Sequence, residues 1–333
     1  MIQAVVAVKD RKGNALKTVF KICVSGILLF FLFRKVGWDE LKENFAKIDP
    51  LVFVFAVACH IVSVIEGAFK WKTFLSKVSI KKLLVTCFGA QFFSTVLPGQ
   101  LFGEMSKIAM LHSETTTNSE IAASVVADKL TGLFTSVAVG IMGILFTEID
   151  LSGSIRWMFL IFFSFFGFCF YLPHIPPANK FLVRWILLGE SVGNTVVRKI
   201  AGVCGGVYEA WRGYVGDGRR VAFNILWGFA VQFTGVIQMW GILWALNINI
   251  SLIEFMWIIP VVSVLLLLPV SFGGLGVREV SVTGFLGLFA VPGNSAVSVS
   301  LIILFGQTVS ALIGGGCLLL DRPKGRFSQE DMS

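Results

Sequence analysis

The sequence has few charged residues. Asp, Glu, Lys and Arg together make up 14% of its 333 residues, and 56% are hydrophobic, whereas soluble domains carry about 25% charged residues. This deficit excludes an ordinary soluble domain, which needs charge over its whole surface. Tyrosine is also scarce, at 3 residues against 32 phenylalanines, and phenylalanine faces lipid without needing a hydrogen-bond partner. The composition therefore predicts an all-α integral membrane protein.

The patterns of common catalytic and metal sites are missing as well. The six cysteines form no CxxC, and the three histidines are dispersed without metal-ligand spacing. The sequence contains no P-loop, no GxGxxG and no evident Ser/His/Asp or Cys/His pairing. We therefore expect no catalytic residue, no metal and no cofactor. The net charge of +8 comes from short basic stretches between apolar runs, which is typical of cytoplasmic loops beside anionic lipid and not of a nucleic-acid surface.

Long apolar runs dominate what remains. A spanning helix needs about 20 mostly apolar residues, and six stretches meet this requirement: Leu16–Phe33, Leu51–Phe69, Ile121–Phe146, Ile155–Leu172, Val221–Leu246 and Ser295–Leu320. Two further runs, Leu83–Leu97 and Phe255–Leu268, are shorter and are followed by proline and glycine. Short segments broken in this way favour re-entrant helical hairpins that enter and leave on one side of the membrane. Two ordinary spans kinked at proline are the alternative.

Basic residues in the loops indicate the orientation. The N-terminal arm, the loop after the second span, the segment 173–220 and the C-terminal tail are rich in Lys and Arg, so we expect all four in the cytoplasm. The loop after the second span carries Lys70, Lys72, Lys77, Lys81 and Lys82 without an acid. Within the connector 173–220, the stretch 190–214 is either a helix on the inner membrane face or a plain linker.

This orientation divides one membrane domain into two similar halves. Each half contains two spans, a hairpin and a third span, and the halves begin on opposite sides of the membrane. The hairpin prolines, Pro98 and Pro269, differ by 171 in number, which is about half the chain. The pattern predicts an inverted-topology repeat with both termini in the cytoplasm. We expect the first repeat at about 16–150 and the second at about 155–322.

The first of three charged groups follows the first hairpin turn. Ionisable residues inside a membrane are costly and are functional candidates by default. Pro98 and Gly99 end the apolar run, and the glycines of this motif, Gly99 and Gly103, permit a tight reversal. A helix that starts near residue 101 places Glu104 and Lys107 one turn apart on the same face. An anion-binding helix start and a simple salt-bridged turn both fit this pattern.

The second group follows the second hairpin turn. Arg278 and Glu279 come directly after a glycine-rich stretch that lets backbone approach a ligand or another helix closely. The preceding hairpin residues are Pro269, Ser271, Gly273, Gly274 and Gly276. Arg278 has the fork geometry that grips a phosphate through two hydrogen bonds. We expect Glu279 to hold this arginine in place or to relay a proton.

The third group is Asp128 and Lys129, inside the expected span Ile121–Phe146. Adjacent residues point to different faces of a helix, so these two do not pair with each other and one needs a partner on another helix. We expect both to face an interior cavity; a structural ion pair with the hairpin charges is the alternative. Gln307 has a roughly corresponding place in the last span, where it faces the same cavity or joins two helices.

Three separated motifs resemble one known family. LPGQLFGEMSKIAML (97–111), ASVVADKLTGL (123–133) and LPVSFGGLGVREVSVTGFLGLFAVP (268–292) are similar to the lysylphosphatidylglycerol synthase transmembrane family, also called flippase-like. The resemblance covers nearly the whole chain. It matches Glu104 to the acid of the first motif, Lys107 to a position that is more often arginine, Asp128-Lys129 to the acid–base pair of the second, and 271–279 to the third.

The resemblance implies a lipid translocase of the cytoplasmic membrane. Bifunctional members flip an aminoacylated phospholipid that a C-terminal soluble domain makes; this chain ends shortly after its last expected span, so we expect no synthase domain and no enzyme activity. Other relatives accompany glycosyltransferases that act on polyprenyl lipids. The expected partner is thus an anionic, aminoacylated or polyprenyl-phosphate lipid, together with a separate lipid-modifying enzyme or a second copy of the chain. Phosphate-binding bases would be Lys107, Lys129 and Arg278.

Two other functions stay open on the sequence alone. One is an integral-membrane transferase for lipid-linked sugar or aminoacyl donors, which needs a nucleotide or metal site that the sequence does not show. The other is a non-catalytic subunit that assists a separate synthase. Neutralising Glu104 or Arg278 abolishes function in a translocase and leaves an accessory subunit intact.

Overall fold

The computed structural model describes residues 48–96, 101–111, 117–147, 195–267 and 275–320, with isolated positions between 153 and 191. Every regular element in these ranges is a helix, as an all-α fold requires. The expected span Leu16–Phe33 lies outside the described residues, and so does most of Ile155–Leu172. Outside them too are the hairpin residues Pro98, Gly99, Pro269, Ser271, Gly273 and Gly274.

Four of the described helices are long and apolar enough to cross a membrane. They are α3 (Pro50–Lys72), α6 (Asn118–Phe146), α10 (Gly218–Ala245) and α13 (Gly293–Leu320). Each matches one of the expected spans to within three residues at either end, and α10 ends at Ala245, one residue before the expected Leu246. At about 1.5 Å per residue, 23 to 29 residues exceed the roughly 30 Å hydrocarbon core.

Side chains at the helix starts explain where three of these helices begin. Asp49 accepts a hydrogen bond from the N–H of Leu51, with Pro50 at the first helical position. Thr117 and Glu120 form a reciprocal capping box before α6, and Asp217 accepts from the N–H of Arg220 at the start of α10. Each acceptor satisfies a backbone donor that the helix itself leaves free.

Two pairs of shorter helices lie at the expected hairpins. The first pair is α4 (Ile80–Val96) and α5 (Leu101–Met110), and the second is α11 (Leu252–Leu267) and α12 (Val277–Gly287). Gly103 of α5 lies directly against Ala90 and Ser94 of α4, where an added Cβ would come within 2.7 Å of both. In the second pair, the rings of Trp257 and Phe285 meet edge to face, with centroids 5.7 Å apart.

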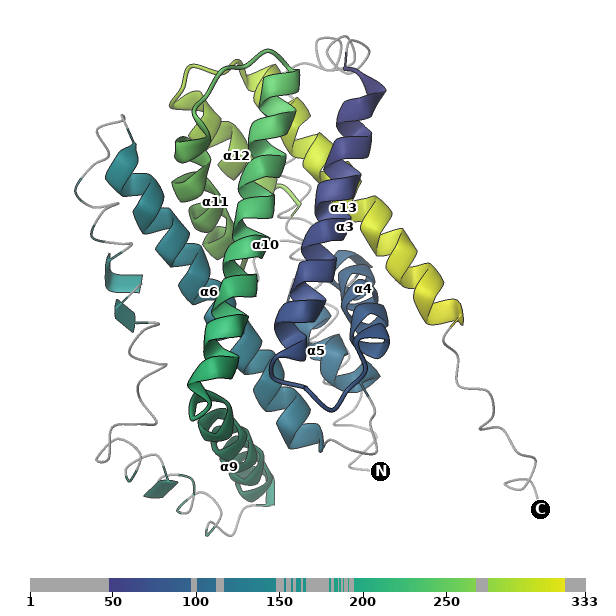
Figure 1. The fold of residues 1–333 in the computed structure, drawn as a ribbon, viewed down its shortest axis with the longest axis vertical. Coiled ribbons are helices and arrows are strands. Elements are labelled where there is room, and N and C mark those ends of the chain that lie inside the picture. Colours follow the sequence, from purple (N-terminus) through teal and green to yellow (C-terminus); the bar gives the residue numbers. More distant parts are fainter. Residues whose placement is uncertain are drawn as a thin grey trace, which may run out of the picture.

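Each short pair packs on a long helix from the other half of the chain. α4 packs on α13, from the other half of the chain, and α11 packs on α6. α3 and α10 lie side by side and run in opposite directions (Figure 1). In the same view α4 and α5 lie toward the lower end of the bundle and α11 and α12 toward the upper end. The largest apolar core lies where α3, α6, α10, α11 and α13 meet.

A second core at the lower end holds α3 against α6. Trp71 is fully buried there, and its indole N–H donates to the hydroxyl of Ser124 at 2.9 Å. The bond satisfies the one polar atom of a large apolar side chain. It also fixes the end of α3 next to the middle of α6, where Asp128 and Lys129 follow one turn later.

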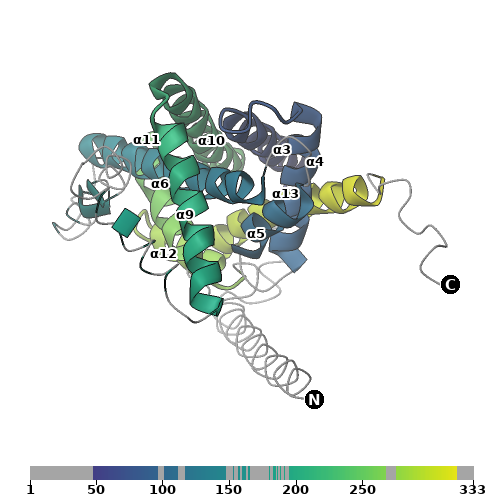
Figure 2. The ribbon, with the colours of Figure 1, turned by 90° about the horizontal axis from the view of Figure 1, so that it is seen from below.

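The connector contains a helix, α9 (Thr195–Val215), which packs on α6 and α10. It lies across the lower end of the bundle when the molecule is seen from below (Figure 2). Tyr214 donates from its hydroxyl to the carbonyl of Glu120 at 3.1 Å and stacks at a tilt on Phe74. Burial raises the pKa of Tyr214 to about 12, so the phenol remains a donor. Residues 195–215 are thus helical, as one of the two alternatives for 190–214 requires, and the place of this helix on the inner membrane face stays a prediction.

Candidate functional site

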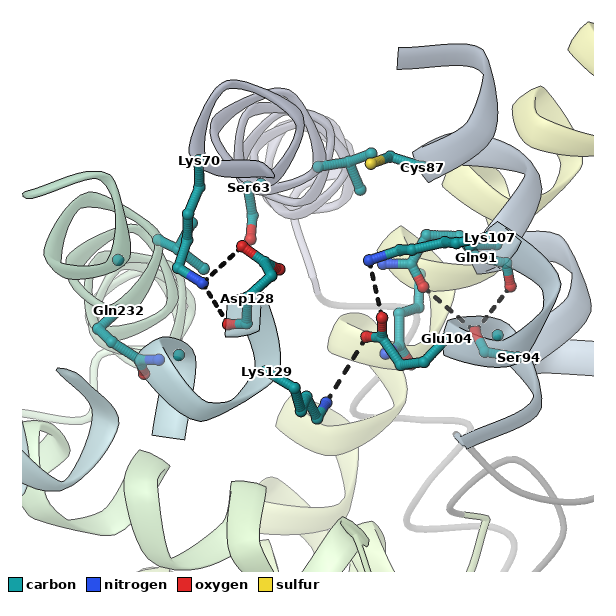
Figure 3. A pocket seen from close by; sticks show the side chains of 18 of the residues that line it. Ser63, Lys70, Cys87, Gln91, Ser94, Glu104, Lys107, Asp128, Lys129 and Gln232 are labelled. Atoms are coloured by element: carbon teal, nitrogen blue, oxygen red, sulfur yellow. Dashed lines mark hydrogen bonds and ion pairs between the residues drawn. The ribbon is translucent and has the colours of Figure 1, made fainter. Parts of the chain in front are cut away.

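A polar cavity of about 320 Å³ lies among six helices at the lower end of the bundle. Its wall comes from α3, α4, α5, α6, α10 and α13, so both halves of the chain contribute (Figure 3). Five charged side chains line it: Lys70, Glu104, Lys107, Asp128 and Lys129. A cavity of this size is at the lower end of small-ligand sites, about 300–1,000 Å³, and suits a headgroup rather than acyl chains.

Glu104 connects two of the lysines. It lies in the first turn of α5, and Lys107 follows one turn later with its Nζ 2.8 Å from Glu104 Oε2. Lys129, from α6, approaches the other carboxylate oxygen of Glu104 at 3.7 Å. The Lys107 ammonium also lies 5.3 Å from the ring centroid of Trp71, a favourable cation–π arrangement. α5 and α6 are therefore joined through one carboxylate.

Asp128 pairs with Lys70 of α3. Lys70 Nζ lies 2.8 Å from Asp128 Oδ1 and donates to the Asp128 carbonyl at 2.5 Å. Gly132, one turn along α6, faces the same ammonium, and an added Cβ there would lie 3.5 Å from it. Such a distance is an ordinary van der Waals contact, so a small side chain at 132 would leave the lysine beside the carboxylate.

The placement of Lys70 in a cytoplasmic loop was wrong. α3 continues to Lys72, and Lys70 is only 4% exposed. Its long apolar stem lets the ammonium reach a partner on another helix from a helix end. The sequence carried a signal for this ion pair. Asp128 needed a cation from another helix, and the lysines that follow the expected span Leu51–Phe69 have no acid among them. The independent partners of Asp128 and Lys129 confirm that these neighbours do not pair with each other.

The rest of the cavity wall is polar but uncharged. Gln91 and Ser94 of α4, Gln232 of α10 and Gln307 of α13 line it. Ser94 donates to the carbonyl of Gln91 at 2.9 Å, and the Gln91 amide lies 3.5 Å from His60 Nε2. Gln307 thus faces the cavity, one of the two places expected for it, whereas Gln91 was not predicted as a lining residue.

Arg278 and Glu279 are not among the residues that line this cavity. Both are buried, at 3% and 0% exposure. Glu279 Oε2 accepts the N–H of Gly276 at 2.6 Å, and Gly276 has a φ of 82°, which favours glycine. The Glu279 carboxylate thus caps α12, whereas we expected it to hold Arg278 in place or to relay a proton. Among the residues that the structure describes, Arg278 Nη1 is buried and has no hydrogen-bond partner.

The described residues offer no group of three or more His, Cys, Asp or Glu side chains that could hold a metal ion. What the cavity offers is ammonium groups, carboxylates and amides. Such groups bind charged and hydroxyl-bearing ligands through ion pairs and hydrogen bonds.

The fold and the cavity define a polytopic helical membrane protein with a charged internal site. The chain belongs to the family described as lysylphosphatidylglycerol synthase TM region, whose sequence model matches residues 18–315. Membership connects its function with membrane lipids, and it confirms the resemblance drawn from the three motifs. No curated protein matches the chain.

Proposed function

We propose that the protein is a lipid translocase of the cytoplasmic membrane, which moves a phosphate-bearing or aminoacylated lipid between leaflets. The observation that carries the proposal is the charged cavity among helices whose outer faces are apolar. Charged side chains inside a membrane protein mark substrate pathways. A headgroup occupies the cavity while its acyl chains stay in the lipid around the bundle. The protein makes no covalent change to the lipid.

The proposed architecture has six spans, two re-entrant hairpins and an inverted repeat with both termini in the cytoplasm. Two pairs of close helix contacts support the repeat. Gly306 lies against Ala56 and Val57, and Gly228 lies against Thr135; 306 exceeds 135 by 171, and 228 exceeds 57 by 171. This offset equals the one between the hairpin prolines.

A second pair of contacts agrees with the first. Gly314 of α13 lies against Phe88 of α4, and Gly143 of α6 lies against Met256 of α11. Here 314 exceeds 143 by 171, and 256 exceeds 88 by 168. In both halves, the first helix of the short pair packs on a long helix of the other half: α4 on α13, and α11 on α6. This equivalence supports transport by rocking one repeat against the other around a central site. Lys107 and Arg278, which also differ by 171, take equivalent places in this scheme.

Replacing Lys107 with glutamine is expected to slow lipid movement by about tenfold or more, the effect of losing one charge-assisted hydrogen bond. Lys107 is the cation that the hairpin itself contributes to the cavity. The measurement follows headgroup-labelled phosphatidylglycerol in proteoliposomes, with chemical quenching of label in the outer leaflet. Lys77→Gln, on the exposed turn between α3 and α4, is the matched control and should move lipid at the wild-type rate.

Two results would contradict the proposal. If wild-type protein accelerates no labelled lipid, whether anionic, zwitterionic or aminoacylated, the protein is not a translocase. If wild-type and Lys107→Gln protein support a separate lipid-modifying enzyme equally well and neither moves lipid, the accessory role takes its place.

A further inference from the structure

The charges in the cavity do not balance. Among the described lining residues, three lysines face two carboxylates: Lys70, Lys107 and Lys129 against Glu104 and Asp128. With every group ionised, the cavity carries one net positive charge. An uncompensated charge in a cavity attracts a group of opposite charge, so a ligand that brings one net negative charge completes the site. The other polar lining residues, among them Gln91, Gln232 and Gln307, are neutral and leave this count unchanged.

The uncompensated charge can be assigned to Lys129. Lys70 and Lys107 each lie 2.8 Å from a carboxylate oxygen, while Lys129 lies 3.7 Å from Glu104, which it shares with Lys107. The Lys129 side chain is also 37% exposed, against 13% for Lys107 and 5% for Lys70. Lys129 therefore has the weakest ion pair and the most accessible ammonium. A phosphate oxygen can replace Glu104 there while Lys107 keeps its partner.

We propose that the cavity selects lipids whose headgroup has a single net negative charge, a phosphodiester with uncharged hydroxyls, and that Lys129 contacts the phosphate. The glutamine amides supply donors and acceptors for the hydroxyls. One added ammonium, as in phosphatidylethanolamine, leaves the headgroup with no net charge to offset that of the cavity. The two ammonium groups of lysyl-phosphatidylglycerol bring net positive charge to a positive site, and a diphosphate leaves one negative charge uncompensated. The inference rests on the proposed function and specifies the substrate of that same site.

Lipid binding tests this selectivity separately from transport. Detergent-purified protein is incubated with an equimolar mixture of phosphatidylglycerol, phosphatidylethanolamine and lysyl-phosphatidylglycerol that have identical acyl chains. Native mass spectrometry then counts the lipids retained. Wild-type protein is expected to retain phosphatidylglycerol over lysyl-phosphatidylglycerol by about two- to fivefold, the ratio expected from one partly exposed charge pair.

Lys129→Glu changes the net charge of the cavity from one positive to one negative, because two lysines then face three carboxylates. The preference is expected to reverse toward lysyl-phosphatidylglycerol, and Lys129→Gln should bind the zwitterionic lipid best. Lys77→Glu makes the same change of charge on the exposed turn and should keep the wild-type order. This control separates the cavity from the overall charge of the protein.

The outcomes for binding and for transport differ. Equal retention of the three lipids by the wild type, or the same order in Lys129→Glu as in the wild type, overturns the inference even if lipids are moved in proteoliposomes. A preference that follows the charge series without any lipid movement supports the inference and overturns the proposed translocation. If Lys77→Glu shifts the lipid preference as much as Lys129→Glu does, the inference is also overturned, because the charge of the cavity then does not decide which lipid binds.

Discussion

Replacing Asp128 with asparagine is expected to lower the free energy of unfolding by about 3–5 kcal/mol, the usual effect of removing one partner from a buried ion pair. Lys70 is almost completely buried, and its ammonium lies 2.8 Å from the Asp128 carboxylate. Asparagine keeps the shape but leaves the buried lysine charge without a counter-charge. The loss is measured by unfolding the purified protein in detergent with heat or with denaturant.

The matched control is Asp217→Asn. Asp217 pairs with Arg220 at 2.8 Å, but both side chains are more than 40% exposed, and such pairs contribute about 0–1 kcal/mol. Asparagine also caps a helix start as well as aspartate does, so the start of α10 keeps its acceptor. A loss in Asp128→Asn no larger than in Asp217→Asn would mean that the pair with Lys70 is not buried in the folded protein.

The double variant Lys70→Met/Asp128→Leu removes both charges of the ion pair. It distinguishes the effect of an unpaired lysine from the effect of losing the two side chains. Buried ion pairs are often replaced by apolar residues of similar size at no cost in stability. The double variant is therefore expected to recover most of the stability that Asp128→Asn loses. A double-mutant cycle with Lys70→Met and Asp128→Leu measures the coupling between the two residues. Additive losses would show that each side chain acts alone.

Local spacing was enough to predict part of the site. Glu104 and Lys107 lie three residues apart in a short helix, and any helix at this place brings them to one face. The partner of Asp128 was not predictable in this way. Lys70 lies 58 residues earlier in the chain, and only the packing of α3 on α6 through Trp71 and Ser124 brings the two together.

The long helices were predictable for a different reason. The membrane demands about 20 apolar residues in each span, so α3, α6, α10 and α13 follow from composition to within a few residues. Composition does not predict which helices these four contact, because each of them is apolar on most sides. Which helices touch is decided by small residues that permit close approach, and those contacts were visible only in the structure.

Replacing Gly314 with alanine is expected to destabilise the protein by about 1–3 kcal/mol, the usual result of overpacking a close contact. Gly314 lies so close to the Phe88 carbonyl that an added Cβ would clash with backbone, which cannot rotate away. Gly316→Ala, two residues further along α13, is the control. Its added Cβ meets no atom within 4 Å, and alanine favours a helix over glycine by up to about 1 kcal/mol.

Gly143→Ala extends the same test to the other half of the chain. Its added Cβ would lie 2.8 Å from the backbone nitrogen of Trp257 in α11. If the two halves hold their short helices in equivalent ways, Gly143→Ala and Gly314→Ala lose similar stability in thermal unfolding, while Gly316→Ala loses none. A loss confined to Gly314→Ala would limit the close contact to one half and remove a main support of the inverted repeat. Equal losses would tie both short helix pairs to spans of the opposite half, the arrangement that lets one repeat move against the other.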